Sequence, residues 1–285
     1  MTRLTIGMPL YNNARTIERA VKSLQQQTFG DFRLLMSDDG STDDTPAIAE
    51  RLAAGDSRLT FTRQPRNLNY GNFRYVLSRA ETPLFAFAAG DDWWLPTYME
   101  RCVELLDKNP EAVCATTRTC FVYEDGESFV TPGTVALTGS PEENIAKYFD
   151  LYYENSRMYG VFRTGVAKRA FPNGDHYAYD VTFSAASMRE GVHLEYPEVL
   201  MHREITPPER YIEYVRRDNG WWLTRFFPLL PMTWSLFVEK RIPRTRKVIA
   251  ALLNVNLLQH RVYVERFHPR LLPLSDKLLR WFSVH

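Results

Sequence analysis

The stretch 33–46, RLLMSDDGSTDDTP, joins a short apolar run to a helix start through a turn of acidic and small residues. Asp44 or Thr45 followed by Pro46 is typical of a helix N-terminus, where a side-chain oxygen caps a free N–H and proline has no donor to leave unpaired. The segment from Asp43 onward therefore has a structural explanation. Asp38 and Asp39 follow a strand without a basic neighbour in sequence, and we expect them to bind a ligand.

The same alternation of apolar runs and helical spacing extends on both sides of this stretch. Strands are predicted at 4–8, 33–37, 59–62, 84–87 and 113–117, with helical patterns over 17–24, 48–52, 76–80 and 99–106. Such βα units predict an α/β fold with a doubly wound, mostly parallel sheet flanked by helices. Further along, a hairpin or loop is predicted over 123–141, helices over 145–153 and 178–190, and a strand over 193–196.

In open α/β sheets, ligands bind beyond the carboxyl ends of the strands, and three more clusters fall at such ends. Residues 8–13, MPLYNN, place Pro9, the ring of Tyr11 and the amide of Asn12 where a flat base could stack, or else form a helix cap with a packing tyrosine. Residues 66–72, RNLNYGN, offer Asn67 and Asn72 to a base or ribose, or form a turn and a cap.

The fourth cluster, residues 88–96, AAGDDWWLP, puts Asp91 and Asp92 directly after an apolar strand. Magnesium and manganese prefer oxygen ligands and share them with substrate phosphates. Adjacent aspartates occur in many loops, but their place at a strand end favours a divalent cation that neutralises a departing diphosphate.

Together and in this order, the clusters resemble the inverting glycosyltransferases of family 2, which have the GT-A fold. The resemblance covers roughly residues 4–205 and rests on 7–12, 37–43, 67–72 and 90–92. It implies a nucleotide diphosphate sugar donor, UDP-type favoured, near Tyr11 and Asp39, and Mn²⁺ or Mg²⁺ on the aspartate motif. The residues it implies as donor contacts are Pro9, Tyr11, Asn12, Asp38, Asp39, Asn67, Asn72, Asp91 and Arg203.

The chain departs from the family's Asp-x-Asp motif, because Ala89 stands at the first position. We assign the metal primarily to Asp91, with Asp92 helping directly or through a hydrogen bond. His202 either reaches the metal or diphosphate or has a structural role, and the structural role is favoured.

An inverting transfer also needs a carboxylate that deprotonates the acceptor hydroxyl. By the resemblance, Asp180 occupies the place of that base at the start of a helix. It could also cap that helix, and Asp175 is the reserve candidate for the base. The processive members' Gln-x-x-Arg-Trp motif is absent from the sequence, which favours a single addition.

We expect residues 1–206 to form the GT-A nucleotide-sugar-binding and catalytic domain and 207–285 a helical appendage. The appendage carries a net charge of +8 against −7 for the rest, with Trp234 and Phe237 among its aromatic residues and Lys240 and Arg244 among its cations. Interleaved rings and cations suit an anionic membrane surface, or pack on the catalytic domain or a second protomer.

Three unpaired cysteines and the lack of a signal peptide or a long apolar run predict a cytoplasmic protein, and the basic, aromatic appendage allows a peripheral position at the inner face of the cell membrane. The acceptor is then a glycan or a lipid-linked glycan, and nucleic acid is not expected as a partner. Two other readings stay open: a non-catalytic protein that binds or scaffolds a nucleotide sugar, motivated by Ala89, and a nucleotidyltransferase, which lacks support because no glycine-rich basic loop follows the first strand.

Overall fold

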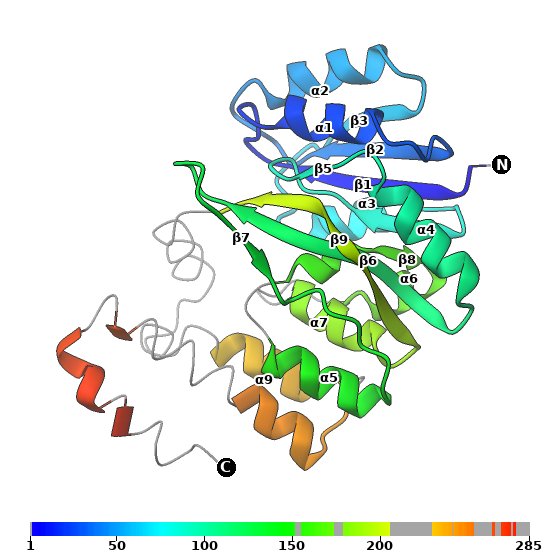
Figure 1. The fold of residues 1–285 in the computed structure, drawn as a ribbon. Coiled ribbons are helices and arrows are strands. Elements are labelled where there is room, and N and C mark those ends of the chain that lie inside the picture. Colours follow the sequence, from blue (N-terminus) through cyan, green and yellow to red (C-terminus); the bar gives the residue numbers. More distant parts are fainter. Residues whose placement is uncertain are drawn as a thin grey trace.

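The computed structural model describes residues 2–151, 155–173, 179–205, 230–240 and 242–253, with short pieces between 264 and 277. The N-terminal part alternates strands and helices as predicted (Figure 1). Its elements are β1 (Leu4–Leu10), α1 (Ile17–Gln25), β2 (Phe32–Asp38), α2 (Thr45–Ala54), β3 (Leu59–Arg63), α3 (Gly71–Ser78), β4 (Leu84–Phe87), β5 (Trp93–Trp94) and α4 (Tyr98–Lys108). The short strand β5 was not predicted.

The second half departs further from the sequence-based expectation. Its elements are β6 (Ala112–Val122), β7 (Ser128–Thr131), α5 (Pro141–Asp150), η1 (Ser156–Tyr159), β8 (Val161–Arg163), α6 (Thr164–Ala170), α7 (Tyr179–Ser187), β9 (Val192–Glu204), α9 (Leu230–Val238) and η3 (Pro269–Leu271). The hairpin predicted within 123–141 is confirmed as the pairing of β6 with β7. Strand β9 is much longer than predicted, β8 and α6 were not predicted, and residues 152–153 and 178 of two predicted helices lie outside the described residues.

The described strands form one sheet in the order β3-β2-β1-β4-β8-β6-β9-β5, with β7 added to β6. The pairs β1–β2, β1–β4, β2–β3 and β6–β9 are parallel, whereas β8 is antiparallel to both of its neighbours. Strands β1, β2, β3, β4, β6 and β9 therefore all run in one direction. The predicted α/β architecture with a mostly parallel sheet is confirmed, and the carboxyl ends of these strands meet at one edge.

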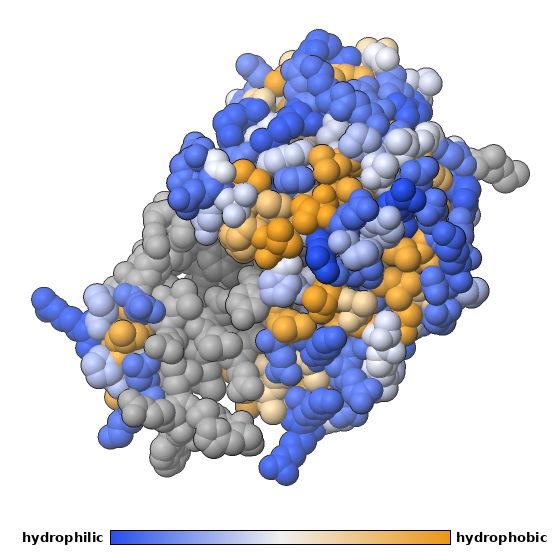
Figure 2. All heavy atoms as spheres, in the orientation of Figure 1, coloured by the Kyte–Doolittle hydropathy of each residue, from blue (hydrophilic) through white to orange (hydrophobic). Residues whose placement is uncertain are grey.

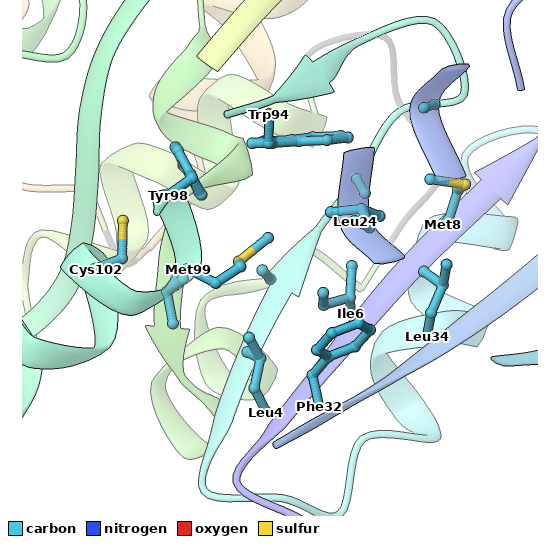
Figure 3. Close-up of a cluster of buried hydrophobic side chains, with 14 of the residues drawn as sticks. Leu4, Ile6, Met8, Leu24, Phe32, Leu34, Trp94, Tyr98, Met99 and Cys102 are labelled. Atoms are coloured by element: carbon cyan, nitrogen blue, oxygen red, sulfur yellow. The ribbon is translucent and has the colours of Figure 1, made fainter. Parts of the chain in front are cut away.

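Alternate side chains of β1 contact the helices on the two faces of the sheet. Leu4, Ile6 and Met8 are fully buried on the face that α1 and α4 cover, where they meet Leu24 and Met99 (Figure 3). On the other face Gly7 lets α3 approach, because a Cβ there would lie 2.8 Å from Val76 Cγ2. Successive side chains of β1 therefore point to the helices on opposite faces of the sheet, as expected for a strand that is buried on both faces.

The described residues of the C-terminal segment between 230 and 253 pack on the helices below the sheet. Leu236 of α9 and Ile242, Val248, Ala251 and Leu252 share one buried cluster with apolar side chains of α5 and α7. Among the residues with a described conformation, no helix is long and apolar enough to span a bilayer.

Candidate functional site

The predicted ligand residues gather at the carboxyl edge of the sheet because the strands that carry them share one direction. Asp38 ends β2, Glu204 ends β9, and Asp91 lies between β4 and β5. Trp93 of β5 pairs with His202 of β9, which brings the turn after β4 beside the end of β9. Segments far apart in sequence therefore meet there.

Asp38 and Asp39 are buried in the turn after β2. Oδ2 of Asp38 accepts the backbone N–H of Ser41 at 3.1 Å and lies 3.6 Å from Nε of Arg63, whereas its buried Oδ1 has no hydrogen-bond partner. Asp39 accepts the backbone N–H of Leu68 at 2.7 Å, and burial raises the pKa of its carboxyl. A buried acceptor without a donor is costly, so Asp38 Oδ1 fits a site that receives a donor from a ligand.

The rest of the acidic turn is structural, as its sequence predicts. Oδ1 of Asp43 accepts the backbone N–H and the hydroxyl of Thr45 at 3.0 and 2.6 Å, at the start of α2. Oδ1 of Asn12 accepts the backbone N–H of Thr42 at 2.9 Å and so fastens the loop after β1 to the turn after β2. The ring of Tyr11 beside it is 49% exposed and free to stack against a ligand.

Asn67 and Asn72, the expected contacts from the loop after β3, are both engaged within the protein. Oδ1 of Asn67 accepts the backbone N–H of Asn69 at 2.7 Å. Asn72 is 1% exposed; its Oδ1 accepts the hydroxyl of Ser37 at 2.6 Å and its Nδ2 donates to the Ser37 carbonyl at 2.8 Å. Pro9 faces the same Ser37 across β1 and β2. Because the amide of Asn72 is buried against β2, it supports the turn, and the expected contact of Asn72 with the donor stays a prediction.

Asp92 is buried and paired with an arginine from the end of β9. Nε of Arg203 lies 3.1 Å from Oδ2 of Asp92, and another guanidinium nitrogen donates to the hydroxyl of Ser156 at 3.1 Å. Burial raises the pKa of the neighbouring Asp91, while the charge of Arg203 counteracts this effect. The two adjacent acids thus differ: Asp92 is bonded to an arginine, and Asp91 has a carboxyl whose charged form a cation would stabilise.

Gly90 allows this acidic turn to lie against the end of β1. A Cβ at Gly90 would lie 2.7 Å from Cγ of Asn13 and 2.8 Å from Cδ2 of Leu10, closer than real Cβ contacts. The glycine therefore fixes the distance between the acids and the loop that carries Tyr11.

A second set of charges reaches the same turn. Arg19 of α1 donates to the backbone carbonyl of Asp91 at 2.7 Å and to Oε2 of Glu204 at 2.7 Å, and its guanidinium lies 4.1 Å from the ring centre of Trp93. Arg15 pairs with the other oxygen of Glu204. Burial raises the pKa of Glu204, but the two guanidinium groups outweigh it and the net pKa is lowered. Sequence reasoning missed these charges, because single charged residues on a loop, a helix and a strand end form no motif.

Asp180 lies in the first turn of α7, as predicted, whereas Asp175 lies outside the described residues. Burial raises the pKa of the Asp180 carboxyl, opposed by the nearby amide of Asn155, whose buried Nδ2 has no hydrogen-bond partner among the described residues, and by the charge of Arg203. The amide of Asn155 is fixed in turn, because its Oδ1 accepts the hydroxyls of Tyr148 and Ser184, each at 3.0 Å. Asn155 was not found from the sequence, since it precedes a short 3-10 helix without a recognisable pattern.

Tyr159 shows that the acids and Asp180 share one site. Burial raises the pKa of its hydroxyl, the charge of Arg203 lowers it, and the charges of Asp92, Asp91 and Asp180 raise it. Interactions between charges weaken with distance, so these groups lie near one partly buried ring, and the Arg203 guanidinium lies 4.8 Å from the centre of that ring. The structure therefore brings the predicted base and the predicted metal residues together.

His202 adds a neutral imidazole to this surface. Its ring stacks on Trp93 with centres 5.2 Å apart, its Nδ1 is buried without a hydrogen-bond partner, and burial lowers its pKa. Within the described ranges, no three His, Cys, Asp or Glu side chains are grouped to hold a metal. Magnesium and manganese do not need a full protein cage, since phosphates and waters complete their shells. The acidic pair fits such a partial site, with the half-buried Asp91 as the better donor.

Fold and site together define an α/β protein that has a ligand site with paired acids and an arginine at the carboxyl edge of its sheet. The profile of the family described as "Glycosyl transferase family 2" matches residues 5–168, which is more than half of the chain. The chain belongs to this family and is a glycosyltransferase.

Two curated relatives illustrate the sequence similarity. The chain is 29% identical over 187 residues to a protein of Campylobacter jejuni named GalNAc(5)-diNAcBac-PP-undecaprenol beta-1,3-glucosyltransferase, covering 64% of this chain and 58% of that protein. It is 26% identical over 203 residues to an uncharacterized glycosyltransferase of Haemophilus influenzae, covering 67% and 62%. The chain thus spans about three fifths of the length of these relatives.

Two solved structures share the fold. Residues 1–349 of Staphylococcus aureus TarS, crystallised with UDP-GlcNAc, superpose with a TM-score of 0.64 at 16% identity, covering 98% of this chain and 80% of that one. The mannosyltransferase PcManGT of Pyrobaculum calidifontis, in complex with GDP-Man and Mn²⁺, gives 0.61 at 15% identity, covering 98% and 74%. At these identities the similarity establishes the fold.

Proposed function

We propose that this glycosyltransferase moves one sugar, with inversion, from a nucleotide diphosphate sugar to a hydroxyl of a glycan or lipid-linked glycan. The observation that carries the proposal is the buried Arg203–Asp92 pair with Asp91 and Asp180 around Tyr159. Such a site offers both a place for the leaving diphosphate and a carboxylate for the acceptor. The TarS and PcManGT complexes with nucleotide sugars and the lipid-linked substrate in the Campylobacter relative's name support the two substrate classes.

The nucleotide is proposed to lie over the loops after β1, β2 and β3. Tyr11 stacks on the base, and the buried carboxyls of Asp38 and Asp39 accept a base N–H. Uracil offers such a donor at N3, and the UDP-GlcNAc complex of TarS supports a UDP-type donor. Asn12 and Asn67 shape the rim through their turn hydrogen bonds, and Pro9 lies below them in β1.

The diphosphate is proposed to lie at Asp91 and Arg203. A divalent ion held by Asp91, with Asp92 beside it, would neutralise charge that builds on the leaving diphosphate. Arg203 donates to the carboxyl of Asp92, and Arg19 donates to the backbone carbonyl of Asp91. The carboxylates that would hold the ion are therefore in position before substrate binds. Mn²⁺ in the PcManGT complex supports this use of Mn²⁺ or Mg²⁺.

Asp180 is proposed to be the general base. Its raised pKa makes the carboxylate a stronger proton acceptor than an exposed aspartate. When the acceptor oxygen attacks the anomeric carbon, its proton passes to Asp180 and the bond to the diphosphate breaks on the opposite face. Attack opposite the leaving group inverts the anomeric centre.

The domain division at residue 206 and a peripheral location at the inner membrane face are part of the proposal. Trp234 is 66% and Phe237 43% exposed on α9, and the Arg244 guanidinium lies 5.3 Å from the Phe237 ring centre. Exposed rings beside cations support contact with anionic lipid. Sedimentation with vesicles of phosphatidylglycerol, reversed by salt and lost in Trp234→Ser, is expected; no binding to such vesicles would refute this part.

The proposed reaction is tested without knowing the acceptor, because water can take its place. We expect proton NMR to show slow, Mn²⁺-dependent hydrolysis of a UDP-sugar, with the inverted anomer appearing first. Asp180→Asn should abolish hydrolysis and keep donor binding, with Asp31→Asn, exposed just before β2 at the opposite edge of the sheet, as the control. Release of the retained anomer would refute inversion, and donor binding without any turnover would favour the non-catalytic alternative that Ala89 suggests.

A further inference from the structure

The hairpin of β6 and β7 carries an aromatic face that the proposed reaction does not use. Phe121 of β6 and Phe129 of β7 are register partners, with ring centres 5.5 Å apart and planes inclined by 13°. Tyr123 lies 6.0 Å from Phe129, and these two side chains are 44% and 46% exposed. The hairpin therefore presents three neighbouring rings, two of them open to solvent.

This aromatic face is continuous with the acidic site. Phe121 is also the register partner of Arg203 in β9, and the Arg203 guanidinium lies 5.2 Å from the Phe121 ring centre. The same guanidinium bonds Asp92. A lateral row across three adjacent strands thus leads from the exposed ring of Phe129 through Phe121 to the acids.

The turn of the hairpin faces the loop on the other side of the site. Gly126 has φ +90 and closes the turn, which a glycine adopts without strain. The hydrogen bond that Arg15 donates to Glu204 raises the pKa of the Arg15 guanidinium, and the charge of Glu124 in the hairpin turn adds to this effect. Figure 1 shows the hairpin rising beside β1 and α1, and Figure 2 shows its hydrophilic tip with apolar side chains below it. The aromatic face and the loop after β1 therefore flank the same opening.

We propose that this aromatic face is an acceptor subsite that binds a neutral pyranose ring, a proposal that rests on the function proposed above. The C–H face of a sugar packs on an aromatic ring, while its hydroxyls can donate to the exposed carboxylates of Glu124, Asp125 and Glu127. The same three charges repel an anionic bilayer, which argues for a saccharide at this surface. A sugar seated on Phe129 would extend the acceptor chain toward Arg203 and Asp180.

The test is binding of the full chain to an array of immobilised neutral oligosaccharides. Phe129→Ala removes the exposed ring, Phe129→Tyr keeps a ring, and Val130→Ala is the matched control. Val130 is the next residue, 51% exposed, and it points to the opposite face of the hairpin. We expect Phe129→Ala to weaken binding of the preferred glycans about tenfold, equivalent to about 1.4 kcal/mol, and the other two variants to bind as the wild type does.

Three outcomes would overturn the proposal: Phe129→Ala binding as well as the wild type, an equal loss in Val130→Ala, or no wild-type binding to any glycan on the array. Loss of binding to phosphatidylglycerol vesicles in Phe129→Ala would instead assign the face to a membrane. Thermal shift with UDP- and GDP-sugars and Mn²⁺ is run on all four proteins. If the nucleotide sugars raise the Tm of all four proteins equally and Phe129→Ala does not change glycan binding, only the acceptor subsite is refuted. If no nucleotide sugar raises the Tm of any of the proteins, the proposed function is refuted.

Discussion

Replacing Arg203 by methionine tests the buried ion pair that organises the site. Methionine keeps much of the volume packed on Phe121 and Tyr159 but removes the charge next to Asp92, whose side chain is 2% exposed. Removing one partner of a buried pair leaves an unpaired buried charge and typically costs about 3–5 kcal/mol. We therefore expect Arg203→Met to lower the free energy of unfolding by about 3 kcal/mol.

The double variant Arg203→Met with Asp92→Asn leaves neither charge, so most of this loss should be recovered. Arg118→Met is the control, because the Arg118 side chain is 51% exposed and lies 3.6 Å from Glu195, and exposed pairs contribute about 0–1 kcal/mol. Urea unfolding followed by circular dichroism measures all four proteins. The reasoning is refuted if Arg203→Met costs no more than Arg118→Met, or if the double variant is less stable than Arg203→Met.

Three further predictions follow from the same site. Because burial raises the pKa of Asp180 above 3.8, activity should be lost on acidification at a pH above that value, and the acidic limb of a kcat/KM profile measures it; a limb at or below 3.8 would contradict the buried base. Gly90→Ala should destabilise the protein by about 1–3 kcal/mol, since its methyl group would collide with Asn13 and Leu10; calorimetry that finds no change in Tm would show that the turn can move. The raised pKa of Asp91 means that its charged form costs stability at neutral pH, and this cost disappears as the pH falls through the folded pKa toward 3.8. Asp91→Asn should therefore be more stable than the wild type at pH 8, with a difference in Tm that shrinks toward pH 4; a constant difference would point to a cause other than ionisation.

The sequence predicts the first half of the fold well, because local patterns decide it there. Apolar runs at Leu4–Leu10 and Phe32–Asp38 are buried on both faces, and amphipathic helices separate them. The helix α5 was predicted to begin four residues too late, although a readable signal existed. Ser140 and Glu143 form a capping box around Pro141, and that spacing marks the start in the sequence.

Strand β9 was predicted too short because its burial comes from distant partners. Polar residues such as His193 and Glu195 interrupt its apolar pattern, and the strand is stabilised by pairing with β6. β8 was missed for a similar reason: three residues between a 3-10 helix and α6 have no periodicity of their own, and their place is set by β4 and β6.

At the site, single loops were readable and contacts between loops were not. The acidic turns at Asp38 and Asp91 follow apolar strands, which is a local pattern. The bonds from Arg203 to Asp92 and from Arg19 to Asp91 join residues 111 and 72 positions apart, and only the sheet order brings them together. The buried position of Asn72 in α3 likewise depends on Ser37 in strand β2.

The central claim, a nucleotide-sugar donor bound at the acidic pair, is tested most directly by calorimetric titration with UDP-, GDP- and ADP-sugars, with and without Mn²⁺. The account predicts that one nucleotide class binds the wild type, and that Mn²⁺ makes this binding tighter. Asp91→Asn should lose the metal-dependent part of the affinity, while the control Asp31→Asn, exposed at the opposite edge of the sheet, keeps it. Absence of binding by every donor with Mn²⁺ present would contradict the account.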